Sequence, residues 1–298
     1  MQKKWKILSV PQRIKVYSPA KINLYLNIIE QYRDGFHKIE SIINRINLFD
    51  EITIEVTSGE DIYFSCNKKN LEKEDNLCVK VASLLKEKYN LKYGLNIYLK
   101  KNIPIGGGLG GGSSNAASVI LGVNKILNLK LSFEELTKIG RQLGSDVNFF
   151  LAECPWAYVE GRGEKVKPLD ISTRLHYLLV YPNIPISTAD IYRKTKVGLT
   201  KFIDNVNILI HALKRQDYLL VEKTSYNALE KSAMAVCKKL RDIKISFRKG
   251  GFFCQLTGSG STLFVLLRNY SHTIKKKINA LAQKMREKGF LVFLAQTY

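Results

Sequence analysis

The stretch "PIGGGLGGGSSNAASVILGVNKIL", residues 104–127, constrains this chain more than any other. It carries six glycines between Gly106 and Gly112, followed at once by Ser113 and Ser114 and a helical-looking apolar run. Because each glycine costs conformational entropy on folding, such a run is either a flexible linker or a place where the backbone approaches something closely. A linker would be longer and flanked by disorder. Here a strand-like segment, 94–104, comes before the glycines, and a segment with helical spacing, 115–128, follows.

A strand, a glycine loop and a helix N-terminus together predict an anion site. Backbone N–H groups point outward, the helix dipole adds partial positive charge, and bare backbone lets phosphate oxygens come near. Ser113 and Ser114 add hydroxyl groups where a phosphate or its metal would lie. A Walker A loop is excluded because no Lys follows the glycines. A G-x-G-x-x-G match at Gly106, Gly108 and Gly111 is nearly forced by the glycine density. The acidic residue that a dinucleotide-binding fold would carry ~20 residues later is missing, so we discount that fold.

The amino-acid composition limits the number of domains, the cysteine chemistry and the membrane association that can be expected. The 298 residues are 45% hydrophobic and 24% charged, which suits one large or two modest globular domains. The five cysteines are scattered without C-x-x-C spacing, so we expect idle thiols and no zinc site. No run approaches the ~18 apolar residues of a membrane helix. The basic N-terminus resembles an export signal, but Pro11 and Arg13 break its apolar part, so we expect a cytoplasmic protein without membrane partners.

The net charge of +21 favours a polyanionic partner, either nucleic acid or a phosphorylated small molecule. The basic residues are dispersed, and the longest run is Lys275–Lys277. A lysine-rich, solvated surface explains most of them equally well, so the charge alone leaves these interpretations open.

Periodicity predicts mixed elements, and their order argues for an α+β fold. We expect strands in "KVYSPAKINLYLNI" with a bend at Pro19, in "DEITIEVTSG" and in "DIYFSC", and helices in "NLCVKVASLLKEKYNL" and over 115–128. A helix opens on the capping-box pair Ser132 and Glu135 and ends at Gly144. "SDVNFFL" and "WAYVEGRGE" look extended. The second half supplies a strand in "LHYLLVYP", several helices, strand-like "GFFCQLTGSGSTLFVLL", a helix over 271–288 and a last strand, "FLVFLAQ".

The glycine stretch resembles the phosphate-binding motif of the GHMP kinase superfamily, P-x-x-x-G-L-[GS]-[GS]-[GS]-S-x-x-A in loose form. Further segments match in the expected order over nearly the whole chain. They are "SPAKINLYLNI" at 18–28, "DGFHKIES" at 34–41, "EDNLCVKVASLL" at 74–85, "LGSDVNFFL" at 143–151, "GRGE" at 161–164 and "LTGSGSTLF" at 256–264. "GGSSNAA" and "DGFH" look most like the branch whose acceptor is 4-(cytidine 5′-diphospho)-2-C-methyl-D-erythritol.

The resemblance implies a two-domain architecture with the active site in the interdomain cleft. Residues 1–160 would form the ATP-binding part and 161–298 the second domain, with the final strand a candidate to return to the first. The implied reaction moves a phosphoryl group from ATP to the 2-hydroxyl of the acceptor, in the non-mevalonate route to isoprenoid precursors.

The resemblance also implies site residues. Asp146 would accept the hydroxyl proton, with Lys21 as the partner cation that stabilises developing charge. Mg²⁺ is implied by ATP, and Ser114 is the one residue named for it. The ATP-binding set is Asn76, Lys101, Pro104, Gly106, Gly107, Gly108, Leu109, Gly110, Gly111, Gly112, Ser113 and Ser114.

On the acceptor side, the implied set is Asn23, Phe36, His37, Thr188, Tyr192, Gly258 and Ser259. Tyr192 stands where relatives often carry Phe, and Asn148 where they often carry Pro, which predicts a looser loop after Asp146. Two alternatives remain: another GHMP kinase, such as a mevalonate or homoserine kinase, and a non-catalytic nucleic-acid-binding protein. The sequence leaves a monomer or a homodimer open, and no specific nucleic acid is expected.

Overall fold

The protein is described by a computed structural model covering residues 13–195, 205–268 and 272–298. The basic N-terminal stretch and the predicted start of the last helix at residue 271 lie outside the described residues. The chain forms two compact units, each described separately. Unit 1 takes residues up to Ser18, 49–102 and 112–151, and unit 2 takes 19–48, 103–111 and 152–298.

These units divide the chain differently from a single boundary after residue 160. Two long strands, β1 (Arg13–Gln31) and β2 (His37–Thr57), contribute residues to both units, and the glycine loop is divided after Gly111. The domain boundary at 160 therefore stays a prediction.

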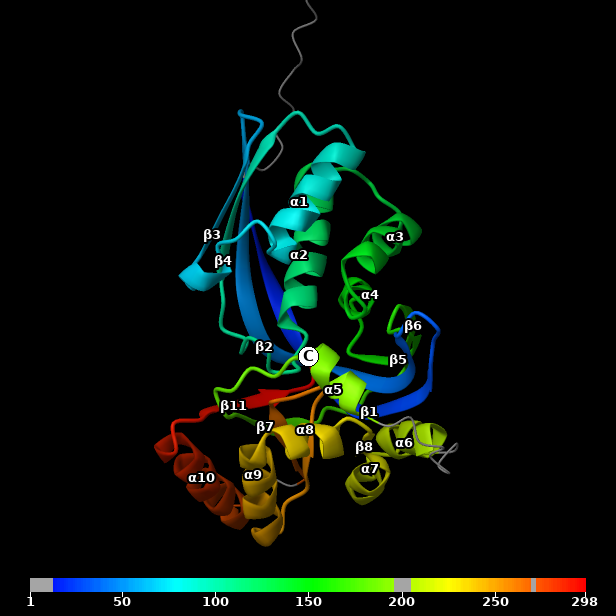
Figure 1. The fold of residues 1–298 in the computed structure, drawn as a ribbon, viewed down its shortest axis with the longest axis vertical. Coiled ribbons are helices and arrows are strands. Elements are labelled where there is room, and N and C mark those ends of the chain that lie inside the picture. The colour runs from blue at the N-terminus through cyan, green and yellow to red at the C-terminus, as the bar shows by residue number, and fades with distance from the viewer. Residues whose placement is uncertain (1–12, 196–204, 269–271) are drawn as a thin grey trace, which may run out of the picture. The chain divides into compact units, whose positions relative to one another are not determined.

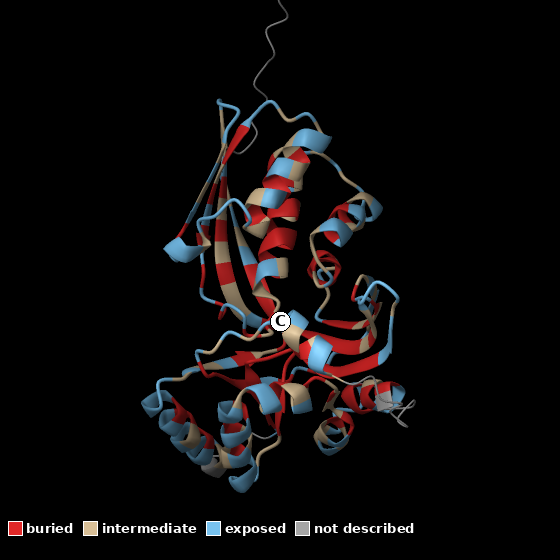
Figure 2. Cartoon of the chain, in the orientation of Figure 1, coloured by how far each residue is buried: buried red, intermediate tan, exposed pale blue. Residues whose placement is uncertain are grey.

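Unit 1 is a sheet covered by helices. Strand β3 (Ile62–Cys66) pairs in parallel with β4 (Gly94–Lys100), which pairs antiparallel with the second half of β2. The helices are η1 (Lys69–Leu71), α1 (Leu77–Lys88), α2 (Gly111–Ile126), α3 (Phe133–Leu143) and α4 (Val147–Leu151). Helix α1 overlaps α2 in the view of Figure 1, and α2 is largely buried (Figure 2). A Cβ at Gly122 of α2 would lie 2.6 Å from Ile54 Cδ1, so the helix packs closely on β2 at this glycine.

Unit 2 holds two groups of strands. The first half of β2 pairs antiparallel with β5 (Trp156–Gly161), β5 pairs with β6 (Lys165–Pro168), and β1 pairs in parallel with β8 (Tyr226–Asn227). A separate antiparallel sheet has the order β11-β7-β10-β9. Its strands are β7 (His176–Tyr181), β9 (Cys254–Leu256), β10 (Leu263–Leu267) and β11 (Leu291–Gln296).

The four-stranded sheet is buried on both faces because its side chains alternate between two apolar cores. Tyr177 and Phe264 join the core that includes α6 and α7, whereas Leu178 and Val265 join the core that includes α9 and α10. The helices of unit 2 are α5 (Thr188–Lys194), α6 (Asn205–Lys214), α7 (Tyr218–Thr224), α8 (Glu230–Val236), α9 (Lys238–Lys249) and α10 (His272–Glu287).

Most predicted elements are confirmed, and three points differ. "SDVNFFL" is wrong as an extended segment, because its last five residues form the buried helix α4. Strand β1 continues through Pro19, where a bend was expected. Strand β2 starts at His37, so its first half was missed. The final strand pairs with β7, and Thr297 beyond it bridges to Ile46 of β2, within the predicted first domain.

Candidate active site

The first half of the glycine loop packs on the second glycine turn of the sequence, within unit 2. A Cβ at Gly108, where φ is +74°, would lie 2.3 Å from the Thr257 carbonyl oxygen. The Gly107 carbonyl accepts a hydrogen bond from the Thr262 amide at 3.1 Å. Gly106 and Gly107 are similarly crowded by Pro185 and Thr262. At Gly108, glycine is therefore required by the protein's own backbone, in addition to the close ligand approach that the sequence predicted.

Two further residues of the predicted ATP set anchor this half of the loop. Leu109 is buried in an apolar core of unit 2, and its carbonyl accepts the Lys21 amide at 3.0 Å. Pro104 is buried as well. These two buried residues therefore fix the path of the loop.

The second half of the loop opens α2. Gly112 is exposed, and a Cβ there would meet nothing closer than Leu77 Cδ1 at 3.7 Å. The first amides of a helix lack intrahelical acceptors, so the amides of Gly111, Gly112 and Ser113 are the donors that a phosphate would need. Ser113 Oγ lies 3.6 Å from the position of a Cβ on Gly144, which places it beside the segment carrying Asp146. Gly112 and Ser113 thus form the part of the loop suited to a ligand.

Asp146 lies between two helices of unit 1. The capping box of Ser132 and Glu135 starts α3, and Gly144 ends it, as predicted. Asp146 then immediately precedes α4 and is partly exposed, whereas Asn148 is buried in α4. The loop after Asp146 was predicted to be looser, but these residues form the buried helix α4. The Asp146 carboxylate therefore lies at the start of a packed helix.

Asn76 and Lys101 are occupied by structural contacts. Asn76 caps α1, because its Oδ1 accepts the Cys78 amide at 2.9 Å while its Nδ2 donates to the Leu71 carbonyl at 3.0 Å. Lys101 is buried and pairs with Asp50 at 2.6 Å. Burial lowers the pKa of Lys101, and the Asp50 carboxylate opposes that shift. Their contacts with ATP stay predictions.

In unit 2, Lys21 and Asn23 project from β1 beside the second glycine turn. Lys21 Nζ donates to Asn23 Oδ1, and Asn23 Nδ2 donates to Ser41 Oγ at 2.9 Å. A Cβ at Gly258 would lie 3.3 Å from Lys21 Nζ and 3.4 Å from Asn23 Oδ1. The structure therefore brings together Lys21, Asn23 and Gly258, which are far apart in the sequence.

The predicted base-binding residues also meet within unit 2. The rings of His37 and Tyr192 lie 5.2 Å apart between centroids, tilted by 38°. Burial lowers the pKa of His37, which favours its neutral ring, able to both donate and accept hydrogen bonds. Thr188, on the same helix as Tyr192, lies 2.8 Å from Ser259 between hydroxyl oxygens. Phe36 is 56% exposed and carries the Arg162 guanidinium 4.8 Å from its ring centroid.

The residues present do not form a protein-built Mg²⁺ site. Across the described ranges, no group of three or more His, Cys, Asp or Glu side chains gathers to hold a metal. The Ser114 hydroxyl is fully buried and accepts a hydrogen bond from Ser18 at 2.9 Å. Magnesium commonly binds through substrate phosphates and water, with few protein ligands.

Several residues that support the site carried no sequence signal of their own. Asn227 donates to the carbonyls of Leu256 and Gly258 at 2.8 and 2.9 Å and so holds the second glycine turn. Ser41 fixes Asn23, and Asp50 fixes Lys101. Ser41, Asn115 and Arg162 lay inside motifs that the sequence had singled out, whereas Asn227 and Asp50 did not.

Within the part of the chain that is described, no helix is long and apolar enough to cross a membrane. The five cysteines lie within the described residues and are free thiols.

The family models define the class of protein. The model described as "GHMP kinases N terminal domain" matches residues 76–153, and "GHMP kinases C terminal" matches residues 209–289. Solved structures agree on the fold: a homoserine kinase from Cytophaga hutchinsonii aligns at TM-score 0.74 with 17% identity, covering 99% of this chain and 97% of that one.

Curated relatives narrow the class. A 4-diphosphocytidyl-2-C-methyl-D-erythritol kinase of Clostridioides difficile is 35% identical over 86% of this chain and 87% of its own length. One from Prochlorococcus marinus is 35% identical over 93% of both chains. A solved 4-(cytidine 5′-diphospho)-2C-methyl-D-erythritol kinase aligns at TM-score 0.77 with 26% identity, covering 95% of this chain and 98% of that one. The chain belongs to the 4-diphosphocytidyl-2-C-methyl-D-erythritol kinase family of the GHMP kinases.

Proposed function

We propose that this protein transfers the γ-phosphoryl group of ATP to the 2-hydroxyl of 4-(cytidine 5′-diphospho)-2-C-methyl-D-erythritol, giving ADP and the 2-phosphate. The observation that carries the choice of acceptor is the His37–Tyr192 ring pair, 5.2 Å between centroids. A cytosine ring can stack on an aromatic face and offer its polar edge to a neutral imidazole. Mevalonate and homoserine have no base that would use these side chains.

The donor side of the proposal rests on the start of α2. The amides of Gly111, Gly112 and Ser113 would bind phosphate oxygens of ATP, with the helix dipole favouring their negative charge. The crowded positions Gly106–Gly108 would act indirectly, by fixing the path of the loop against residues 257–262. Binding ATP in this way positions the γ-phosphorus for attack.

The chemical step needs a base and a cation. Asp146 would accept the proton of the acceptor hydroxyl as its oxygen attacks the γ-phosphorus and the bond to ADP breaks. The Lys21 ammonium, oriented by Asn23, would stabilise the negative charge that develops on the transferring group. Asn23 thereby becomes a positioning residue for Lys21 as well as a candidate acceptor contact.

Replacing Asp146 by Asn tests this chemistry. Asp146→Asn should reduce kcat by roughly 10²–10⁴, the usual contribution of a positioned general base. Calorimetry should show that a non-hydrolysable ATP analogue and the acceptor still bind. Asp170→Asn, which neutralises an exposed carboxylate of unit 2, serves as the matched control. Wild-type turnover by Asp146→Asn would refute the assignment of the base.

No observation favours a nucleic-acid-binding function over catalysis. The exposed aromatic Phe36 is paired with an Arg guanidinium, but the lysines are dispersed over both units. Cytoplasmic localisation and the choice between monomer and homodimer remain predictions.

A further inference from the structure

Five polar side chains of unit 1 are buried beneath the start of α2. Ser18 and Ser114 are fully buried, as is Asp50, and Asn115 and Lys101 are 3% and 7% exposed. They come from β1, β2, the residue after β4 and the first turns of α2. We call these five residues the buried polar chain.

The members of the buried polar chain are linked in sequence by short contacts. Lys101 Nζ lies 2.6 Å from Asp50 Oδ2, and Asn115 Nδ2 donates to the same oxygen at 2.8 Å. Asn115 Nδ2 also donates to Ser18 Oγ at 3.0 Å, and Ser18 Oγ donates to Ser114 Oγ at 2.9 Å. The second Asp50 oxygen accepts the Asn102 amide at 2.7 Å.

The charge on Asp50 fixes the direction of these hydrogen bonds. An ionised carboxylate only accepts, so the Asn115 side chain must turn its NH₂ group toward Asp50. The remaining N–H of that group then points at Ser18, which must accept it. The Ser18 hydroxyl proton is consequently left to donate to Ser114. One anion thus orients side chains on two successive positions of α2.

A buried ion pair by itself adds little to the free energy of unfolding. Desolvating two charges costs free energy that their attraction repays only with good geometry and further hydrogen bonds, and apolar replacements are often equally stable. Four additional hydrogen bonds supply that geometry, and three of them involve Ser114 or Asn115. These two residues directly follow Ser113 in the first turns of α2. This hydrogen-bonded arrangement is suited to holding the first turns of α2 in place.

We infer that Asp50, acting through Asn115 and Ser18, is a positioning residue for the ATP phosphates. It clamps the first turns of α2 so that the amides of Gly112 and Ser113 keep their orientation before ATP arrives. This inference rests on the proposed function, in which that helix start binds ATP. It also gives Ser114, predicted as a Mg²⁺ contact, the role of an internal anchor.

Ser18→Ala tests the inference with the smallest disturbance. It removes the one hydroxyl that joins Asn115 to Ser114 and leaves the Asp50–Lys101 pair in place. Ser118→Ala is the matched control, because Ser118 is a buried serine one turn further along α2 and outside the buried polar chain. The double variant Asp50→Asn/Lys101→Met removes both charges together at similar volume, which avoids leaving a buried lysine without its anion.

The measurements are the Kd of a non-hydrolysable ATP analogue by calorimetry, KM for ATP and for the acceptor, kcat and the unfolding temperature. In Ser18→Ala, Kd and KM for ATP should rise roughly 2- to 10-fold, the range expected for one hydrogen bond. The acceptor KM and the kcat at saturating ATP should stay near wild type. The double variant should show the same pattern with a larger rise, and Ser118→Ala should match wild type.

Unchanged analogue binding in both Ser18→Ala and the double variant would overturn the positioning role while leaving the kinase function standing. An equal loss toward ATP and acceptor together with a lower unfolding temperature would overturn it too, because that pattern indicates a merely structural role. Failure of the wild-type protein to bind the ATP analogue would instead refute the proposed function itself.

Discussion

Gly112 is the loop glycine whose replacement the fold tolerates best. A Cβ there has its nearest neighbour at 3.7 Å, and the residue is exposed in the first turn of α2. Alanine also favours a helix over glycine by ~1 kcal/mol. Gly112→Ala should therefore keep or raise the unfolding temperature, while its methyl group obstructs phosphate approach. We expect KM for ATP to rise roughly tenfold or more, equivalent to ~1.4 kcal/mol.

The control for Gly112→Ala is Gly59→Ala, since a Cβ at Gly59 would also meet nothing within 4 Å. That variant should leave KM for ATP unchanged. Equal ATP affinity in Gly112→Ala and wild type would mean that the phosphates lie elsewhere.

Tyr192 and His37 should act on the acceptor alone. Stacking of a base on an aromatic ring contributes ~1–3 kcal/mol in single-stranded nucleic-acid complexes, so Tyr192→Ala should raise the acceptor KM by roughly 5- to 150-fold. His37→Ala leaves the cytosine edge without its partner, and it should narrow the preference for a cytidine over a uridine acceptor. Steady-state kinetics with both acceptors measures these effects.

Tyr63→Ala provides the comparison for these two variants, because Tyr63 is an exposed tyrosine of unit 1 at 62% exposure. It should change neither KM. A wild-type protein with no cytidine preference, or alanine variants that retain it in full, would contradict the cytosine pocket.

At the scale of an element, α1 depends on Asn76. Its side chain bonds both the Cys78 amide and the Leu71 carbonyl, joining the helix start to η1. Losing an N-cap typically costs ~1 kcal/mol, so Asn76→Ala should lower the free energy of unfolding by about that amount. Asn76→Ser keeps a capping oxygen and should recover most of it in urea titrations. If both variants were as stable as wild type, the cap would contribute nothing.

Elements with local signals were predictable from the sequence. Helix α3 carries its capping box and its terminal glycine within one short segment, and both appear as predicted. In the first half of β2, residues 41–46 are all buried, so this stretch lacks the alternation that marks a half-exposed strand. The five residues of α4 are all buried, and so short an apolar run shows no period that separates helix from strand.

The site was predictable as a set of motifs but not as a set of contacts. The glycine loop was recognisable from the sequence, yet glycine is required at position 108 by the Thr257 carbonyl, 149 positions further along the chain. The same is true of Asp50, whose partners come from β1, α2 and the end of β4. Long-range pairings of this kind carry no local pattern in one sequence.

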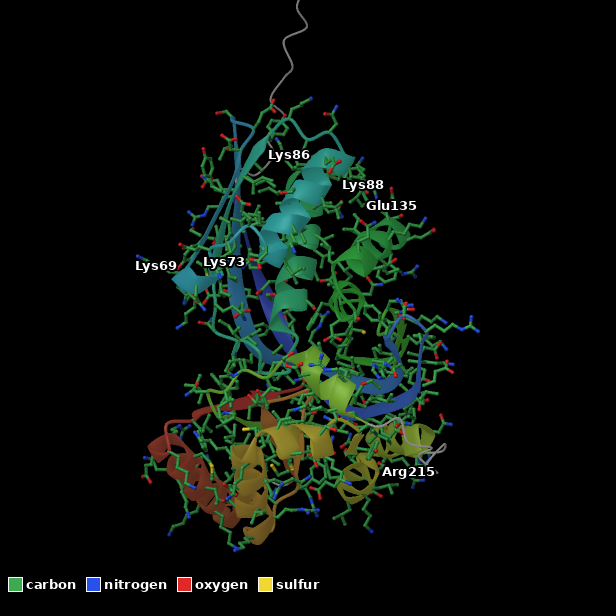
Figure 3. The ribbon with its side chains drawn as sticks, in the orientation of Figure 1. Lys69, Lys73, Lys86, Lys88, Glu135 and Arg215 are labelled. Atoms are coloured by element: carbon green, nitrogen blue, oxygen red, sulfur yellow. The ribbon has the colours of Figure 1, made fainter. Side chains whose placement is uncertain are left out.

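At the scale of the whole molecule, the charge of +21 is distributed over many elements. In unit 1, Lys69 and Lys73 lie at and just after η1, and Lys86 and Lys88 lie in the last turn of α1 (Figure 3). Lys86 Nζ donates to the carbonyls of Leu91 and Tyr93, both at 3.2 Å, so it closes the end of its helix. Such lysines stabilise the ends of helices. They account for part of the excess positive charge without a nucleic-acid partner.

The most direct test of the account is a turnover assay of the wild-type protein with ATP and a panel of acceptors. The panel is 4-(cytidine 5′-diphospho)-2-C-methyl-D-erythritol, mevalonate, homoserine and galactose, each at several concentrations. A site that hydrogen-bonds one substrate rejects analogues lacking those groups by up to roughly 10⁴–10⁵ in kcat/KM. We predict ADP release and a phosphorylated product with the cytidine acceptor and a kcat/KM lower by about 10³ or more with the others. Comparable turnover of any other acceptor, or none of the cytidine compound, would contradict the account.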